Sequence, residues 1–108
     1  MSIEQQYQLR FTRHAAQDLD DLFRVITYDL DAPQAAKSLM AEIESAISNL
    51  KEFPFSAPQS RDGLLARKGY RTLVIRKKYI VLYRIEEAQF EVIIQRILYG
   101  KRDYTKLV

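Results

Sequence analysis

Three closely spaced segments in the C-terminal half of the chain constrain its fold more than any other feature. YRTLVIR (70–76), YIVLYRI (79–85) and FEVIIQRIL (90–98) are rich in β-branched and aromatic residues, which favour strands. The connections between them, 77–78 and 86–89, are short enough for hairpins. Consecutive strands joined by tight turns predict an antiparallel meander.

The part of the chain before this meander has helical spacing of apolar residues in two blocks. The first block follows Thr12, the only good capping side chain nearby, and its pattern stops around Asp29. The second starts at Asp31-Ala32-Pro33, because aspartate caps helices and proline is tolerated in a first turn, and it ends at Pro54. The short break between them predicts an antiparallel helical hairpin. Alternating apolar residues over 7–11 predict a short strand before the first helix.

These segments define the expected fold class and topology. The stretch from Phe53 to Gly69 contains Pro54, Pro58 and Gly63 and is predicted to be a loop. The element order is then β-α-α-β-β-β, in the α+β class. We expect the helical hairpin to pack on one face of an antiparallel sheet, within a single domain over residues 1–108.

Composition excludes several functional classes. The chain has no cysteine and one histidine, which excludes disulfides, thiolate catalysis and multi-histidine metal sites and fits a reducing cytoplasm. Its few glycines form no phosphate-binding loop, dinucleotide fingerprint or nucleophile elbow. We find neither an apolar run of about 18 residues nor an apolar signal core. We therefore expect a cytoplasmic protein with no metal, no cofactor and no membrane partner.

Charge is distributed unevenly along the chain. Residues 1–60 carry five lysines and arginines against nine aspartates and glutamates, a net charge of −4. Residues 61–108 carry twelve against five, a net charge of +7. This asymmetry suggests an anionic partner for the C-terminal half, or a basic solvated surface, and composition favours neither.

Candidate binding residues are concentrated in this basic half. They are Arg71, Arg84, Arg96, Tyr99, Lys101, Arg102 and Tyr104. Guanidinium groups pair with phosphates and tyrosine rings stack on bases, so such a surface can bind RNA. Arginine and tyrosine also dominate protein interfaces, so an acidic protein segment fits equally well. Three other tyrosines, Tyr70, Tyr79 and Tyr83, are predicted to lie at the edge of the core.

Two other groups are interpreted as structural. His14, near the start of the first helix, has no second histidine with which to form a site. Asp18, Asp20 and Asp21 suggest a metal site, but neighbouring helical residues point away from each other, so we interpret them as a solvated helix face.

The ordered combination of these features resembles the RelE/ParE superfamily of toxins from type II toxin–antitoxin modules. The resemblance rests on the element order and on AAQDLDDLFRVI, NLKEFP, GYRTLVIRKKYIVLYRI and RILYGKRDY, which together extend over nearly the whole chain. The long helical hairpin and Leu82-Tyr83-Arg84 are more similar to the ParE branch.

The RelE-like branch cleaves mRNA on the ribosome with basic residues of the second and third strands and of the C-terminal end. The resemblance matches Arg71 to a lysine of that set and Arg102 to an arginine, whereas Leu73 and Ile80 stand where that branch has cations. Tyr99 stands where the family ending commonly has histidine. The terminal catalytic tyrosine falls near Val108, with Tyr104 close by. As a nuclease, the chain would use Arg71, Arg102, Tyr99 and Tyr104.

The ParE-like branch instead resembles inhibitors of DNA gyrase that act by binding. The resemblance therefore implies a growth-inhibiting toxin that binds gyrase and is silenced by a cognate antitoxin. The alternative is a ribosome-dependent mRNA endonuclease. In either case the resemblance implies that operator DNA is contacted only through the antitoxin.

Overall fold

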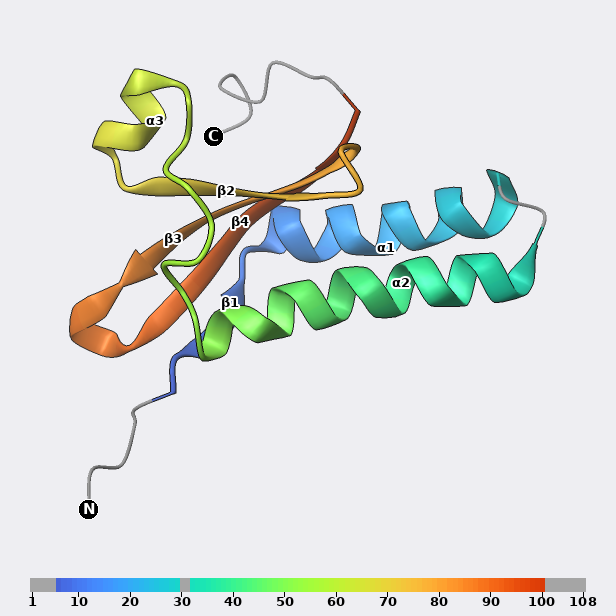
Figure 1. Cartoon of the computed structure of the whole chain (residues 1–108), viewed down its shortest axis with the longest axis horizontal. Coiled ribbons are helices and arrows are strands. Elements are labelled where there is room, and N and C mark those ends of the chain that lie inside the picture. Colours follow the sequence, from blue (N-terminus) through green and yellow to red (C-terminus); the bar gives the residue numbers. More distant parts are fainter. Residues whose placement is uncertain (1–5, 30–31, 101–108) are drawn as a thin grey trace.

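Four strands form one mixed sheet in the order β1-β4-β3-β2. The computed structural model describes residues 6–29 and 32–100 and is shown in Figure 1. The strands are β1 (Gln8–Phe11), β2 (Tyr70–Ile75), β3 (Tyr79–Glu86) and β4 (Glu91–Tyr99). β2, β3 and β4 pair antiparallel, which confirms the meander. β1 pairs parallel with β4, so the expectation of a wholly antiparallel sheet is wrong. After β1 the chain passes through the helices and enters the sheet again at the opposite edge, as β2. β3 and β4 then follow in turn, so β4 lies between β3 and β1.

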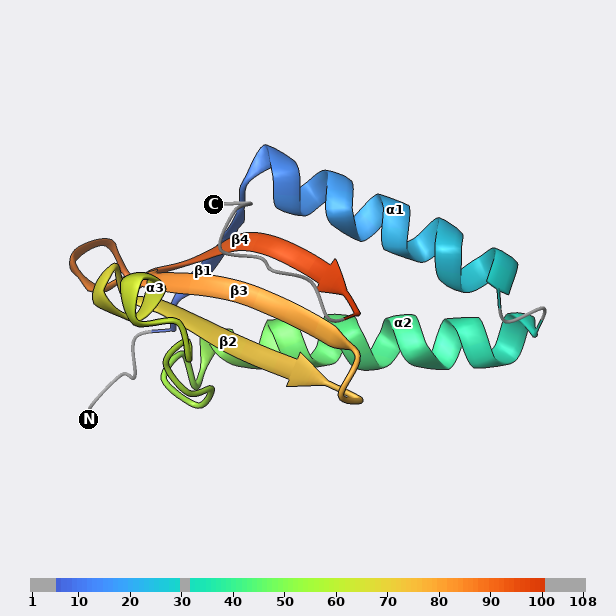
Figure 2. The same cartoon turned by 90° about the horizontal axis from the view of Figure 1, so that it is seen from above.

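The two long helices form the expected hairpin. α1 (Arg13–Asp29) and α2 (Pro33–Ser48), followed by the 3-10 turn η1 (Asn49–Lys51), lie side by side beneath the sheet and extend beyond it (Figures 1 and 2). Thr12 caps α1, because its hydroxyl oxygen accepts a hydrogen bond from the Ala15 amide at 3.0 Å. Ala32 occupies the capping position of α2 without a side-chain bond, and Asp31 lies outside the described residues.

The main core fills the space between the hairpin and the sheet. Its most buried side chains come from both layers and include Ala15, Ile26, Leu39, Ile43, Ile47, Val81, Tyr83, Val92, Ile94 and Ile97. Of the three tyrosines predicted at the edge of the core, Tyr70 is partly exposed and Tyr79 is 7% exposed, but Tyr83 is 0% exposed and belongs to the core interior. No helix among the described residues is both long enough and apolar enough to cross a bilayer.

The predicted loop between α2 and β2 contains a short helix, α3 (Gly63–Arg67), so the prediction of a loop from Phe53 to Gly69 is partly wrong. Asp62 starts this helix, since its carboxylate accepts a hydrogen bond from the Leu65 amide at 3.0 Å. Gly69 ends it with φ of +86°, a left-handed conformation that glycine adopts without strain. α3 lies on the side of the sheet opposite the hairpin (Figures 1 and 2).

Candidate functional site

Arg71 is held against the loop that follows α2. Its guanidinium donates a hydrogen bond to the Ala57 carbonyl oxygen at 2.7 Å and lies 5.0 Å above the ring centroid of Phe55. Strand alternation places Arg71 on the same face of β2 as Leu73, which packs against the core. The guanidinium of Arg71 is therefore part of the packing on the hairpin side of the sheet.

Arg84 lies on β3, directly opposite Tyr70 of β2. It forms an ion pair with Glu86, which follows two residues later on the same face of the strand. A second ion pair, between Arg10 of β1 and Glu91 of β4 at 3.8 Å, adds another acidic group at this end of the sheet. The positive charge of Arg84 is thus partly neutralised within the chain.

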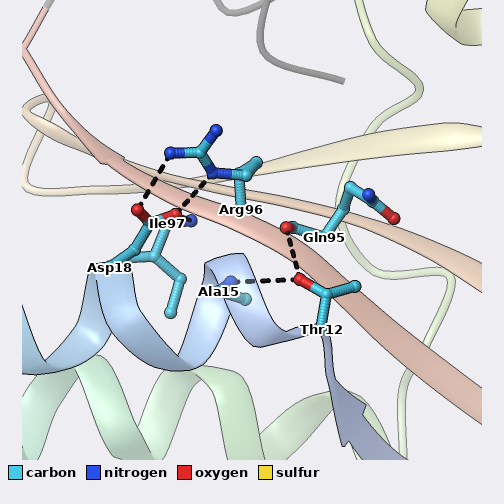
Figure 3. A network of polar contacts seen from close by, with 6 residues as sticks. All are labelled: Thr12, Ala15, Asp18, Gln95, Arg96 and Ile97. Atoms are coloured by element: carbon cyan, nitrogen blue, oxygen red, sulfur yellow. Dashed lines mark hydrogen bonds and ion pairs between the residues drawn. The ribbon is translucent and has the colours of Figure 1, made fainter.

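Arg96 forms a largely buried ion pair with Asp18 of α1 (Figure 3). Arg96 Nε and Nη2 donate to the two carboxylate oxygens at 2.7 and 3.0 Å, and the side chains are only 16% and 14% exposed. The hydrogen bond to Asp18 raises the pKa of Arg96 above its ordinary value, so the guanidinium stays charged. Asp20 and Asp21 are exposed as predicted, but the interpretation of Asp18 as a solvated residue is wrong.

The same carboxylate also binds the backbone of β4. The pairing of β3 with β4 skips Gln95, which leaves a bulge in β4 just where β1 has ended. The Thr12 hydroxyl donates to the Gln95 carbonyl oxygen at 2.8 Å, and the Ile97 amide donates to Asp18 at 3.0 Å (Figure 3). Side chains of the α1 region therefore satisfy backbone groups that a longer β1 would otherwise bind.

Tyr99 lies at the end of β4 beside α1. Its side chain is 49% exposed, and its ring centroid lies 5.4 Å from that of Tyr79. A groove of about 210 Å³ runs between α1 and this end of β4, with Asp21, Leu22, Val25 and Tyr99 in its walls. Tyr99 thus offers an aromatic surface next to an acidic helix face.

The structure brings only some of the predicted site residues together. Arg96 and Tyr99 line the same groove, whereas Arg71 and Arg84 have opposite orientations on neighbouring strands. Lys101, Arg102 and Tyr104 lie outside the described residues. Across residues 6–29 and 32–100, no three potential metal ligands of the His, Cys, Asp or Glu type lie together.

At the two positions where the RelE-like branch has cations, this chain has the apolar residues Leu73 and Ile80, which contact other apolar residues in the structure. Leu73 packs against the core, and Ile80 lies on the other face of the sheet, opposite Val74 of β2. The single histidine, His14, is exposed on α1 and lines none of the hollows described in this section. The described part of the sheet therefore offers no imidazole as a general base.

Asp18 is the important polar residue that the sequence interpretation missed. On a helical projection it borders the apolar stripe formed by Ala15, Leu19 and Leu22 rather than lying opposite it. An arginine in the middle of a strand, Arg96, needs a partner. These two signals together indicate a pair between the first helix and the last strand.

Comparison with known proteins identifies the family. Residues 9–104 match the family model of the ParE toxin of the type II toxin–antitoxin system, parDE. No curated protein sequence matches the chain significantly.

Several solved structures have the same fold. A chain of the chromosomal ParDE toxin–antitoxin system of P. aeruginosa is 24% identical, with a TM-score of 0.69 over 91% of this chain and 100% of that one. A chain of the RelBE2 toxin–antitoxin complex of Mycobacterium tuberculosis is 28% identical, with a TM-score of 0.56 over 87% and 98%. The isolated RelE toxin of E. coli is 14% identical, with a TM-score of 0.56 over 94% and 92%. With a family model that matches nearly its whole length, the chain belongs to the ParE toxin family of type II toxin–antitoxin systems.

Proposed function

We propose that this chain is a growth-inhibiting toxin that acts in the cytoplasm by binding DNA gyrase, without chemistry of its own. The observation that carries this proposal is the position of Arg71, the residue that matches a basic group of the RelE-like nucleases. Its guanidinium is bound to the Ala57 carbonyl and stacked on Phe55 on the hairpin side of the sheet. Neighbouring Leu73 has no charge to contribute. Binding is therefore favoured over RNA cleavage.

The target-binding surface that we propose is the C-terminal end of β4 with the residues that follow it. Tyr99 provides an exposed aromatic ring there. Lys101, Arg102 and Tyr104 add two cations and a second ring in the sequence, and tyrosine with arginine is the usual composition of an interface centre. Arg96 supports this surface through its pair with Asp18. Arg71 and Arg84 are bound within the chain nearer the other end of the sheet, so we do not place them in this surface.

We further propose that a cognate antitoxin neutralises the chain. Relatives with this fold come from a ParDE system and from RelBE toxin–antitoxin complexes. The net charge of +7 over residues 61–108 favours an acidic partner segment. We expect the operator of such a module to be bound by the antitoxin, with this chain making no direct DNA contact.

A pair of assays tests the target. The purified chain is added to a DNA gyrase supercoiling reaction and to a translating-ribosome reaction in which mRNA cleavage is measured. We expect inhibition of supercoiling and uncleaved mRNA. Cleaved mRNA with unaffected gyrase would establish the alternative, a ribosome-dependent endonuclease, and overturn the proposal.

A double substitution tests the surface. Lys101→Ala with Arg102→Ala should abolish both growth inhibition and gyrase inhibition, because the two cations follow Tyr99 closely in the sequence. The matched control is Arg67→Ala with Lys68→Ala, which removes the same charge from the end of α3. Equal toxicity of the first double variant and the unchanged chain would refute the proposed surface.

A further inference from the structure

The turn between β2 and β3 has an unusual backbone for its sequence. Arg76 and Lys77 have positive φ, of +53° and +60°, and the Lys78 amide closes the turn by donating to the Ile75 carbonyl oxygen at 3.2 Å. Turn positions with this left-handed conformation are usually glycine, asparagine or aspartate, because a bulkier side chain strains the backbone. Residues held in such conformations cluster at functional sites, so the cations of this turn are candidates for a binding role.

This turn lies beside the C-terminal end of β4 (Figures 1 and 2). The Gly100 amide donates to the Lys78 carbonyl oxygen at 2.8 Å. Arg61, from the segment before α3, lines the same hollow of about 320 Å³ as Lys77 and Gly100. Two segments that are separate in the sequence therefore bring Arg61, Lys77 and Lys78 together, and we call these three residues the basic end of the sheet.

The basic end carries positive charge that the described part of the chain does not neutralise. All three of its residues are exposed. The remaining cation of the turn, Arg76, donates to the Glu42 carboxylate of α2 at 2.7 Å, but no ion pair among the described residues includes a cation of the basic end. The acidic residue next to Arg61, Asp62, uses its carboxylate to cap α3. The basic end therefore attracts anions.

The opposite end of the sheet differs in this respect. There, Arg84 of β3 is paired with Glu86, and Arg10 of β1 is paired with Glu91 of β4. The arginines at that end thus have counter-ions within the chain, whereas the cations of the basic end do not. A polyanion is therefore expected to approach the sheet from the basic end.

The surroundings of the basic end suit a phosphate backbone better than unpaired bases. The lining of the hollow contains no aromatic ring. The exposed ring of Tyr99 lies in the groove beside α1 and packs 5.4 Å from the ring of Tyr79, which belongs to the core on the hairpin side. Single-stranded nucleic acids are held by bases stacked on aromatic rings, whereas lysine and arginine alone contact the phosphates of a duplex.

We propose that the basic end binds the phosphate backbone of duplex DNA that gyrase holds, without reading bases. The proposal rests on the proposed function for the source of the DNA. The target-binding surface at Tyr99 and the basic end adjoin at Gly100, so both can be engaged together. A few phosphate contacts are weak and independent of sequence, so they add affinity only where gyrase already holds the toxin beside DNA. Recognition of the operator remains with the antitoxin.

Binding to DNA alone provides the first test. A fluorescently labelled DNA duplex of arbitrary sequence is titrated with the chain, and its anisotropy is measured at several salt concentrations. Three phosphate contacts give a slope of log affinity against log salt of about −2.7, which is a loss of about 40-fold between 50 and 200 mM salt. Oligouridine and a polyglutamate of the same charge are the comparison probes.

One substitution separates binding from stability. Lys77→Gly removes a cation and also relieves the left-handed backbone, so it should flatten the slope by about 0.9 without lowering the melting temperature. The matched control is Lys68→Gly, because Lys68 is exposed at the other end of β2 and has an ordinary φ of −84°. It should leave the slope unchanged. Arg61→Gln with Lys78→Gln should flatten the slope by about 1.8.

Equal slopes for Lys77→Gly and Lys68→Gly would overturn the proposal, and so would tighter binding of oligouridine or polyglutamate than of the duplex. Inhibition of gyrase supercoiling is measured with the same variants, and Lys77→Gly should inhibit more weakly than Lys68→Gly. If the chain inhibits gyrase but the two slopes are equal, this site fails and the proposed function stands. If the chain binds the duplex as expected but leaves gyrase unaffected, the proposed function and the gyrase origin of the DNA fail, whereas the contact with DNA remains.

Discussion

At the residue scale, Asp18 connects the two layers of the molecule. One carboxylate on α1 binds the Arg96 guanidinium through both oxygens and also accepts the Ile97 amide of β4. Both side chains of the pair are more than four-fifths shielded from water. When a shielded ion pair loses one partner, the remaining charge is left uncompensated.

Asp18→Asn tests the importance of this pair. The amide keeps the size of the side chain and can still accept a hydrogen bond from Ile97, but it leaves Arg96 without a counter-ion. We expect the free energy of unfolding to fall by about 3 kcal/mol in urea titrations. Asp20→Asn, on the exposed side of the same helix, is the control and should change it by less than about 0.5 kcal/mol. Equal stability of the two variants would show that the pair contributes nothing.

Tyr83 combines burial with one specific hydrogen bond. Its hydroxyl donates to the Pro54 carbonyl oxygen at 2.7 Å, which fixes the loop after α2 to the centre of the sheet. Tyr83→Phe leaves that buried carbonyl unsatisfied. We expect a loss of about 1 to 2 kcal/mol in the free energy of unfolding at neutral pH, measured by urea titration. An unchanged midpoint would indicate that water replaces the hydroxyl.

The same residue makes stability sensitive to alkaline pH. Burial raises the pKa of Tyr83 above its ordinary value, because the phenolate is disfavoured in the core. The folded-state pKa is the higher one, so the contribution is complete below about pH 10 and is lost as pH rises above it. The stability difference between the unchanged chain and Tyr83→Phe should therefore shrink above about pH 10. A constant difference across that range would contradict the effect.

At the element scale, side chains at the start of α1 bind the part of β4 that β1 does not reach. β1 pairs with β4 only as far as Ile94, and the bulge at Gln95 follows directly. Thr12 then has two functions, since its hydroxyl accepts from the Ala15 amide and donates to the Gln95 carbonyl. The start of the helix and the irregularity of the strand are thus stabilised by the same side chain.

Thr12→Ala removes both hydrogen bonds, whereas Thr12→Ser keeps the hydroxyl. We expect the alanine variant to lose about 2 kcal/mol of unfolding free energy, because a helix cap and a strand carbonyl lose their partner together. The serine variant should lose much less. Hydrogen exchange at the Ala15 amide provides a local readout, and similar exchange in both variants would contradict the role of the hydroxyl.

Elements with a strong period were predictable from the sequence, and elements set by distant contacts were not. The hairpin and the meander have repeating apolar patterns, so most of their bounds agree with the structure to within one or two residues. The exception is the end of the second helix, predicted at Pro54, whereas α2 ends at Ser48 and the 3-10 turn after it at Lys51. α3 is too short to show a period, and Gly63 at its start is a residue typical of loops. The parallel pairing of β1, the bulge at Gln95 and the Asp18–Arg96 pair depend on residues far apart in the chain. The orientations of Arg71, Arg84 and Arg96 could not be predicted either, because they depend on the pairing and packing of the folded chain.

At the scale of the whole molecule, the two faces of the sheet have different roles. The hairpin covers one face and shares the main core with it (Figure 1). The other face carries α3 (Figure 1). A hollow of about 320 Å³ on that face is lined in part by Arg61 and Lys77. Arg61 and Lys77 are therefore on the side of the sheet that the hairpin does not shield, whereas Arg76 and Arg96 are paired with acidic residues of the hairpin.

A shared core predicts that both layers unfold together, as expected for a single domain. Ile43 of α2 is 0% exposed and belongs to the same core as Tyr83 of the sheet. Ile43→Val removes one methylene and should lower the free energy of unfolding by about 1 kcal/mol. Helical circular dichroism and tyrosine fluorescence should both report this decrease, with coincident urea midpoints before and after the substitution. If the substitution moved the helical signal alone, the hairpin would be a separate cooperative unit and the two layers would not form one domain.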